Sequence, residues 1–289
     1  MTRQKTVLIT GCTPGSIGYA LVREFQSRDY HVIATVRNTD LVPELTSQGM
    51  TALALDITDS MSIAQCREQV GRITENKLDI LINNAGRGLV TPAVDTDLAD
   101  ARAVYETNLF GVIATINAFI DILIPAKGLI VNISSASALI PYVFGSVYSS
   151  SKAALAAYSR TLREELKPVG VRVQVVMAGT VRSNMGKAVK GELAEGSLYE
   201  PVRHLYLARR GYSQKEGSRP METGEFARRV VDCAVRDEVG GFWRVVGFGR
   251  QDWVFEGGMA RLVGWGSWVG EWVVVLVCGV VFGLGGVKL

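Results

Sequence analysis

Histidine is scarce in this chain of 289 residues, which contains only His31 and His204. A metal centre built on several histidines, or a Ser/His/Asp triad, would need residues that the sequence hardly supplies. The four cysteines form no CxxC pair and no Cys/His ligand spacing; they are Cys12, Cys66, Cys233 and Cys278. We therefore expect no metal site, and reduced, buried thiols in a cytosol-facing compartment.

The chain also lacks an excess of charge of one sign. Its 31 Lys and Arg residues stand against 28 Asp and Glu residues, a formal net charge of +3, and the bases are dispersed. Binding to nucleic acid would need a concentrated basic stripe, so we do not expect that partner. No Pro/Gly/Ser-rich linker divides the chain, and no long apolar leader precedes the first β-rich run, so we expect one unsecreted globular body.

Short runs rich in Val, Ile and Leu recur along the chain, separated by helix-length segments. The runs cover residues 7–10, 31–36, 52–55, 80–82, 129–133 and 171–177. Continuous apolar runs that alternate with helices are typical of a parallel sheet buried on both faces. We therefore predict an α/β fold with a Rossmann-type doubly wound parallel sheet. In such sheets ligands bind beyond the carboxyl ends of the strands.

A glycine-containing turn, Thr10-Gly11-Cys12-Thr13-Pro14-Gly15-Ser16-Ile17-Gly18, follows the first run and opens a helical stretch. Main-chain N–H groups and the helix dipole at such a position can receive a pyrophosphate. An ordinary strand-to-helix turn has a similar composition, but the placement after the first strand favours the nucleotide site. The residues that we expect to line it are Gly11, Thr13, Gly15, Ser16, Ile17 and Gly18.

The end of the second run predicts the cofactor. Arg37 stands where a carboxylate would bind the ribose 2′-hydroxyl of NAD(H), and a guanidinium pairs instead with a 2′-phosphate. The sequence therefore favours NADP(H). The alternative is an ordinary solvated surface arginine.

Chemistry-bearing residues follow the fifth run. Ser135 ends that run, and Tyr148 and Lys152 are four residues apart on one face of the next predicted helix. A neighbouring ammonium and a positively charged nicotinamide would both lower the pKa of Tyr148 and make it a usable acid or base. Ser135 could donate a hydrogen bond to a carbonyl oxygen as charge develops there. A Tyr/Lys pair on a helix surface is common by itself; Ser135 and the nucleotide pattern favour the catalytic interpretation.

Together the glycine turn, Asp56-Ile57, Asn83-Asn84-Ala85-Gly86, Asn108-Leu109-Phe110-Gly111 and Ser-x₁₂-Tyr-x₃-Lys resemble the short-chain dehydrogenase/reductase family over about residues 5–185. The resemblance implies a catalytic set of Asn108, Ser135, Tyr148 and Lys152. In that set the asparagine maintains a water-linked proton relay to the lysine, and the lysine also holds the nicotinamide ribose. It further implies that the cofactor contacts Asp56, Ile57, Asn83, Ala85 and Gly86.

Two departures from the family pattern stand out. The glycine turn is one residue longer than usual, which leaves open whether Gly15 or Ser16 takes the place of the middle glycine. After the sixth run Ala178 replaces a common proline, so we expect a less rigid loop on the nicotinamide side. Val181 and Ser183 are the expected carboxamide contacts there. The longer turn and the apolar tail resemble the branch that contains fungal acyldihydroxyacetone-phosphate reductases.

Two C-terminal segments bear on the substrate and the location of the protein. Residues 185–220 mix apolar and basic side chains, which favours a lid over an apolar substrate with an anionic group or a solvated basic loop. The family's sheet would end near Val246, so we predict a catalytic domain over residues 1–250 and a Trp-rich hydrophobic tail over 251–289. The tail predicts either a monotopic or hairpin anchor at the endoplasmic reticulum or a lipid droplet, or an arm packed on the body or a partner subunit.

The expected function is NADP(H)-dependent reduction of a ketone or aldehyde in lipid or natural-product metabolism, by a homo-oligomer. Two alternatives stay open at this point. The same pocket could reduce or cyclise an imine, or the chain could bind the nucleotide as a regulatory protein without turnover.

Overall fold

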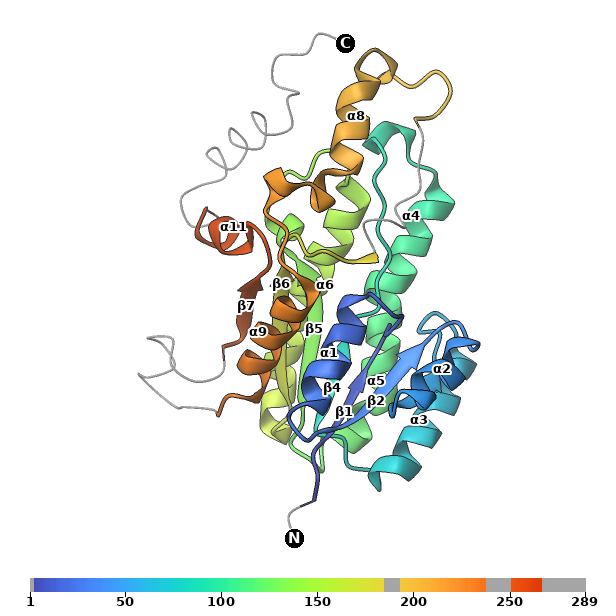
Figure 1. Ribbon diagram of the computed structural model, residues 1–289, viewed down its shortest axis with the longest axis vertical. Coiled ribbons are helices and arrows are strands. Elements are labelled where there is room, and N and C mark those ends of the chain that lie inside the picture. The colour runs from blue at the N-terminus through green and yellow to red at the C-terminus, as the bar shows by residue number, and fades with distance from the viewer. Residues whose placement is uncertain (1–2, 185–192, 238–250, 267–289) are drawn as a thin grey trace.

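The computed structural model describes residues 3–184, 193–237 and 251–266, which form a seven-stranded parallel sheet covered by helices (Figure 1). The strand order is β3-β2-β1-β4-β5-β6-β7, so the predicted doubly wound sheet is confirmed. The chain moves outward from β1 to β3 and then returns to place β4 beside β1, which creates the switch point where such sheets bind ligands. The strands are β1 Thr6–Ile9, β2 His31–Val36, β3 Thr51–Ala54, β4 Ile80–Asn83, β5 Leu129–Ser135, β6 Arg172–Ala178 and β7 Trp253–Glu256.

The two faces of the sheet are buried in two separate apolar cores. Along β1, Val7 and Ile9 enter one core, which α1, α2 and α9 cover, and Leu8 enters the other, which α3, α5 and α6 cover. This alternation follows from the pleat of the strand. The α-helices are α1 Ile17–Gln26, α2 Leu41–Ser47, α3 Ser60–Thr74, α4 Leu98–Tyr105, α5 Gly111–Leu123, α6 Ser146–Leu166, α8 Arg203–Arg210, α9 Thr223–Val235 and α11 Ala260–Gly266. Shorter helical turns are η1 Ala93–Asp95, the π-helix η2 Glu106–Phe110, η3 Ala136–Leu139, η4 Lys167–Val169, η5 Glu200–Val202, η6 Tyr212–Gln214 and η7 Glu216–Ser218.

One helix among the described residues, Leu98–Leu123, is long and apolar enough to cross a membrane by length and composition. It joins α4, the π-helix and α5 end to end. Ile116 and Phe119 of α5 are buried in the second core, against α3 and the sheet. The apolar face of this helix therefore belongs to the interior of the domain.

The last strand corrects the expected end of the sheet. β7 pairs with β6, with Val254 beside Val176, and Val254 is buried in the first core. The sheet therefore does not end near Val246, and a boundary after residue 250 cuts off its seventh strand. The sequence pattern of this strand was weak because only four residues form it and only two of them are buried. The greater part of the predicted tail, residues 267–289, lies outside the described residues.

Candidate active site

The glycine turn after β1 and the loop after β4 pack directly on each other. Gly11 has a φ of 74°, and a Cβ atom there would lie 2.9 Å from the Cα of Ala85. A Cβ atom on Gly18 would lie 2.4 Å from the main-chain oxygen of Gly11. No larger residue fits either position without moving main chain. The turn is thus a main-chain structure at the switch point, as a pyrophosphate site requires.

Side-chain hydrogen bonds from Thr10 and Asn84 hold these two loops together. The Thr10 hydroxyl accepts hydrogen bonds from the main-chain N–H groups of Asn84 and Ala85, both at 3.0 Å. The Asn84 amide donates to the main-chain oxygens of Thr10 and Gly11, at 2.8 and 3.0 Å. Sequence reasoning did not single out Thr10 or Asn84 as site residues. Their position at the ends of two neighbouring strands was the signal that could have found them.

The side chain of Asn83 lies inside the protein. Its side chain is buried and donates to the Asn132 side chain at 2.8 Å, and Asn132 donates in turn to the Ser159 hydroxyl at 2.8 Å. The Asn83 amide thus links β4 to β5 and α6 inside the protein, because alternate residues of a strand face opposite sides of the sheet. The Asn83 side chain is therefore turned away from the cofactor, and the predicted cofactor contact of Asn83 could be made only by its main chain.

The end of β2 lies next to the glycine turn, and β3 lies beside β2. Arg37 is exposed there and makes no hydrogen bond or ion pair with any described residue. Asp56 is partly exposed and accepts hydrogen bonds from the N–H and hydroxyl of Thr58, at 2.9 and 2.7 Å. The side chain of Ile57 is buried in the second core, so only its main chain could face a ligand.

Ser135 and Tyr148 meet at the carboxyl edge of the sheet. Ser135 is the last residue of β5, and Tyr148 lies in the first turn of α6, where the Ser135 hydroxyl is near enough to lower the pKa of the phenol. Lys152 follows one helical turn later, is 3% exposed, and donates from Nζ to the main-chain oxygen of Ile133 at 2.8 Å. Strand β5 and helix α6 thus bring the three predicted groups to one place.

Burial dominates the acid–base properties of these groups. It raises the pKa of Tyr148 to about 12, and the hydrogen bond from Ser135 opposes the rise. Burial also lowers the pKa of Lys152 to about 8. We expected the Lys152 ammonium to lower the pKa of Tyr148, but the groups of the chain itself shift that pKa upward. Tyr148 is therefore a protonated phenol near neutral pH.

Asn108 ties the start of α6 to the loop after β4. It is fully buried in the π-helix, where its Oδ1 accepts from the Arg87 N–H at 2.8 Å. Its Nδ2 donates to the Arg87 main-chain oxygen and to the Ser151 hydroxyl, both at 3.0 Å. Asn108 thus contacts α6 through Ser151, the residue before Lys152. The π-helix widens one turn of the helix Leu98–Leu123, a distortion often found at functional sites.

Comparison with known proteins decides the family. A family profile described as short chain dehydrogenase matches residues 5–193, about two thirds of the chain. The chain belongs to the short-chain dehydrogenase/reductase family. It is therefore an oxidoreductase, and NAD(P)(H) is the cofactor typical of the family.

Relatives and solved structures extend the match beyond that segment. The NADPH-dependent 1-acyldihydroxyacetone phosphate reductase of Schizosaccharomyces pombe is 36% identical over 93% of this chain and 88% of its own length. The short-chain dehydrogenase virD of Hypocrea virens is 42% identical over 70% of this chain and 71% of its own length. A crystal structure of a short-chain dehydrogenase from Streptomyces avermitilis, 24% identical, superposes with a TM-score of 0.77 over 93% of this chain and 94% of its own.

The local geometry of the longer glycine turn shows whether Gly15 or Ser16 takes the place of the middle glycine. Gly15 has a φ of 78°, a conformation that favours glycine. Ser16 is instead the N-cap of α1: its hydroxyl accepts from the Tyr19 N–H at 3.1 Å and donates to the Gly11 oxygen at 3.2 Å. Gly15 therefore takes the conformational role of the middle glycine. Ser16 secures the helix N-terminus that would face the phosphates.

The loop after β6 is tied down despite the missing proline. Main-chain hydrogen bonds join Gly179 to Glu256 at 2.8 Å and Arg182 to Met221 at 2.9 Å. Val181 is buried, and the Asn184 amide donates to the Pro14 main-chain oxygen at 2.7 Å. These partners are distant in sequence, and the expectation of a less rigid loop stays a prediction. Asn184 therefore touches the glycine turn, and Ser183 and Val181 precede it by one and three residues.

An aromatic cluster joins α8 to the loop that precedes α6. Phe144 makes edge-to-face contacts with Tyr199 and Tyr206, with ring centroids 5.2 and 5.6 Å apart. The Tyr206 hydroxyl donates to the Val90 main-chain oxygen at 3.1 Å. Leu193 packs in the same cluster. The apolar part of the predicted lid thus covers the loops after β4 and η3.

The basic residues of the predicted lid behave differently from one another. Arg203 is exposed and pairs with Glu200 at 2.8 Å, as a solvated residue does. Arg209 is buried, and its guanidinium lies 3.5 Å from the centre of the Tyr142 ring. Lys187 lies outside the described residues.

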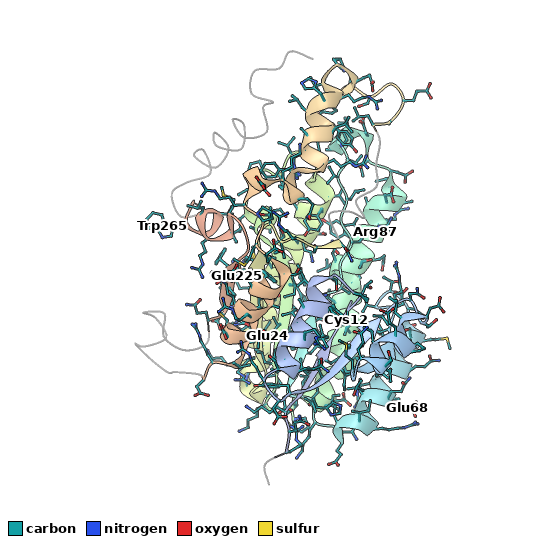
Figure 2. The ribbon with its side chains drawn as sticks, in the orientation of Figure 1. Cys12, Glu24, Glu68, Arg87, Glu225 and Trp265 are labelled. Atoms are coloured by element: carbon teal, nitrogen blue, oxygen red, sulfur yellow. The ribbon has the colours of Figure 1, made fainter. Side chains whose placement is uncertain are left out.

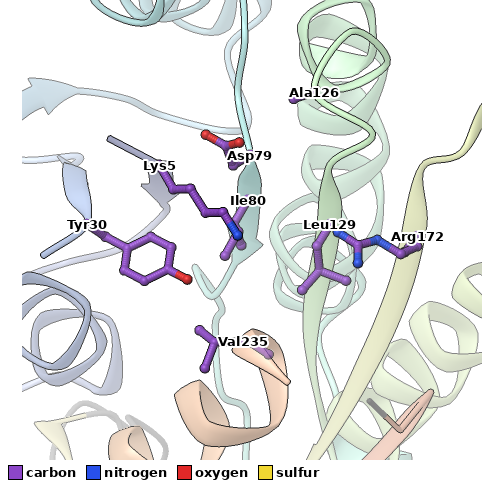
Figure 3. A pocket seen from close by; sticks show the side chains of 9 residues that line it. Lys5, Tyr30, Asp79, Ile80, Ala126, Leu129, Arg172 and Val235 are labelled. Carbon is purple, nitrogen blue, oxygen red and sulfur yellow. The ribbon is translucent and has the colours of Figure 1, made fainter. Parts of the chain in front are cut away.

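A cavity of about 100 Å³ lies at the opposite end of the sheet, between the starts of β1, β4 and β5 (Figure 3). Lys5, Tyr30, Asp79 and Arg172 line it. The catalytic groups follow the carboxyl ends of the strands, so this cavity is not part of the same site.

Proposed function

We propose that this protein is an NADP(H)-dependent reductase that converts a ketone or aldehyde to an alcohol. The observation that carries this proposal is that Ser135, at the end of β5, and Tyr148, at the start of α6, come together at the sheet edge where the glycine turn also lies. The strand carrying Ser135 is separated from β1 by β4 alone, so both halves of the site share one edge. When bound, the dinucleotide supplies the hydride.

Tyr148 donates the proton that the reduced oxygen needs. Its pKa of about 12 keeps the phenol protonated at neutral pH, which suits the direction of reduction. Ser135 donates a hydrogen bond to the same oxygen as negative charge develops. Lys152, with a pKa of about 8, exchanges protons near neutral pH and returns one to Tyr148. Asn108 positions this part of α6 through Ser151.

The residues that would hold the cofactor fit a dinucleotide phosphate. The glycine turn exposes main chain at the N-terminus of α1, and the exposed Arg37 guanidinium is available for a 2′-phosphate. The S. pombe relative is named as NADPH-dependent. We assign further contacts to Asp56, the main chain of Ile57, Ala85, Gly86, Val181 and Ser183.

The substrate that we propose is a lipid-like or natural-product carbonyl compound. Phe144 precedes Tyr148 by four residues, and the cluster that it forms with Tyr206 gathers apolar side chains near the start of α6. The S. pombe relative is named for an acylated ketone phosphate. Reduction of such a ketone would use the same proton donor, Tyr148, and would need no further catalytic group.

We also propose that the protein works at a membrane surface. α11 packs against η3, directly after Ser135, and leaves Leu262 61% and Trp265 79% exposed. Figure 2 shows Trp265 pointing away from the body. Tryptophan at the end of an apolar segment favours the lipid headgroup region, and the sequence continues with Trp268 and Trp272.

Flotation of the full chain with phosphatidylcholine vesicles tests the membrane proposal. Leu262→Glu with Trp265→Glu should weaken binding, whereas Val169→Glu, at another exposed apolar residue, should not. A wild-type chain that stays at the bottom of the gradient contradicts the proposal.

Product identification by mass spectrometry, after incubation of the protein with NADPH and a panel of lipid and polyketide carbonyl compounds, tests the activity. Tyr148→Phe should lower turnover by roughly a thousandfold or more while NADPH still binds, because the proton donor is lost. Tyr158→Phe on the same helix is the matched control and should retain turnover. Wild-type turnover in Tyr148→Phe refutes the mechanism, and NADPH binding without any product refutes the activity.

A further inference from the structure

Ser137, two residues after Ser135, makes two contacts with the Ser135 hydroxyl. Its N–H donates to Ser135 Oγ at 3.2 Å, and its own hydroxyl lies 2.9 Å from the same atom. Ser137 is 5% exposed and lies in η3, the turn that Ser135 caps. No other hydrogen bond of the Ser137 hydroxyl is seen among the described residues.

The two contacts from Ser137 occupy both acceptor positions of Ser135 Oγ. A serine hydroxyl has one hydrogen and two acceptor lone pairs. The Ser137 N–H takes one lone pair. Because the Ser137 hydroxyl donates to the second lone pair, the hydrogen of Ser135 is left to point toward Tyr148, the phenol whose pKa the Ser135 hydroxyl lowers.

We propose that Ser137 is a positioning residue, which directs the Ser135 hydrogen toward Tyr148 and the reacting oxygen by donating two hydrogen bonds to Ser135 Oγ. Donation to a hydroxyl oxygen also polarises its O–H bond, so Ser135 becomes a stronger donor. No covalent bond of Ser137 changes in the reaction. This role rests on the proposed function of Ser135 and Tyr148.

Without the Ser137 hydroxyl, Ser135 loses a fixed orientation and donates more weakly. Ser137→Ala should lower kcat roughly fivefold, the effect of one ordinary hydrogen bond, and leave the Kd for NADPH unchanged. A weaker donor stabilises the Tyr148 phenolate less, which raises the pKa of Tyr148. In alcohol oxidation, where the phenolate is the base, the rate should therefore reach half its maximum at a higher pH than in the wild type.

Four comparisons separate this role from a structural one. Ser137→Cys keeps the shape but has only a weak donor, so it should lose activity as Ser137→Ala does. Ser137→Ala in a Ser135→Ala background should cause no further loss, because Ser137 acts through Ser135. Ser150→Ala removes an exposed hydroxyl from α6 and should match the wild type. Thermal unfolding and NADPH titration of each variant show whether it is folded, and Ser137→Cys replaces Ser137→Ala if the latter is not.

The outcomes are distinct. The role of Ser137 is overturned by unchanged kcat and pH profile in Ser137→Ala, by full activity in Ser137→Cys, or by an equal loss in the Ser135→Ala background. If Tyr148→Phe and Ser135→Ala are inactive while Ser137→Ala is normal, only this inference fails. If Tyr148→Phe is active, the proposed function fails as well.

Discussion

The two sides of the active-site edge are packed in different ways. On the cofactor side, main chain packs against main chain, with Gly11 on Ala85 and Gly18 on the Gly11 oxygen. On the substrate side, the large rings of Phe144, Tyr199 and Tyr206 pack edge to face. Close main-chain contact leaves no room for one additional carbon atom, whereas packing between side chains can adjust to the loss of one polar atom. The first side should therefore be the more sensitive to substitution.

Gly18→Ala should have the largest effect of the changes that probe this difference. Its Cβ would lie 2.4 Å from the Gly11 main-chain oxygen, so the turn must move. We expect the Kd for NADPH to rise roughly a hundredfold, measured by fluorescence titration. Gly224→Ala, where a Cβ would meet nothing within 4 Å, is the control. Unchanged affinity in Gly18→Ala would show that the turn is not the pyrophosphate site.

Arg37→Asp should have a smaller effect, and only on the choice of cofactor. The guanidinium is exposed and holds no other part of the fold, so the protein should remain stable. Replacing it by a carboxylate should repel the 2′-phosphate and shift the ratio of kcat/KM for NADPH over NADH roughly tenfold toward NADH. Arg72→Asp, on the exposed face of α3, controls for the change in net charge. An unaltered ratio would show that Arg37 is an ordinary solvated surface residue.

Tyr206→Phe should have the smallest effect and should spare the cofactor side. The ring contacts remain, and the hydrogen bond to the Val90 oxygen is lost. We expect a loss of about 1 kcal/mol of unfolding free energy and a KM for substrate that is roughly two- to threefold higher. Thermal unfolding and steady-state kinetics measure both. A large rise in the Kd for NADPH would contradict the separation of the two sides.

Several features of the fold and site were predictable because their signals are local. The apolar runs predicted the parallel strands, since strands buried on both faces need continuous apolar residues. The glycine spacing predicted a turn after β1, and the spacing of Tyr148 and Lys152 predicted one helix face. The meeting of Ser135 with Tyr148 followed from the order of strand β5 and helix α6.

Other features depended on contacts between distant segments and were missed. Asn83 and Asn84 are adjacent and chemically identical, but the pleat sends one into the core and the other onto the glycine turn. β7 was missed because four residues carry little periodicity and become a strand only beside β6. The pKa of Tyr148 was expected to fall because charges were considered without burial, which is the larger influence here.

The amino-acid sequence by itself determined the residue types and their spacing along the chain, and with them the family and the chemistry within reach. The tertiary structure decided which of two neighbouring amides faces the turn, where the sheet ends, and how strongly each titratable group is buried. The physical reason is that hydrogen-bond partners, close contacts and desolvation depend on which segments lie side by side, and short-range patterns in the sequence do not contain that information.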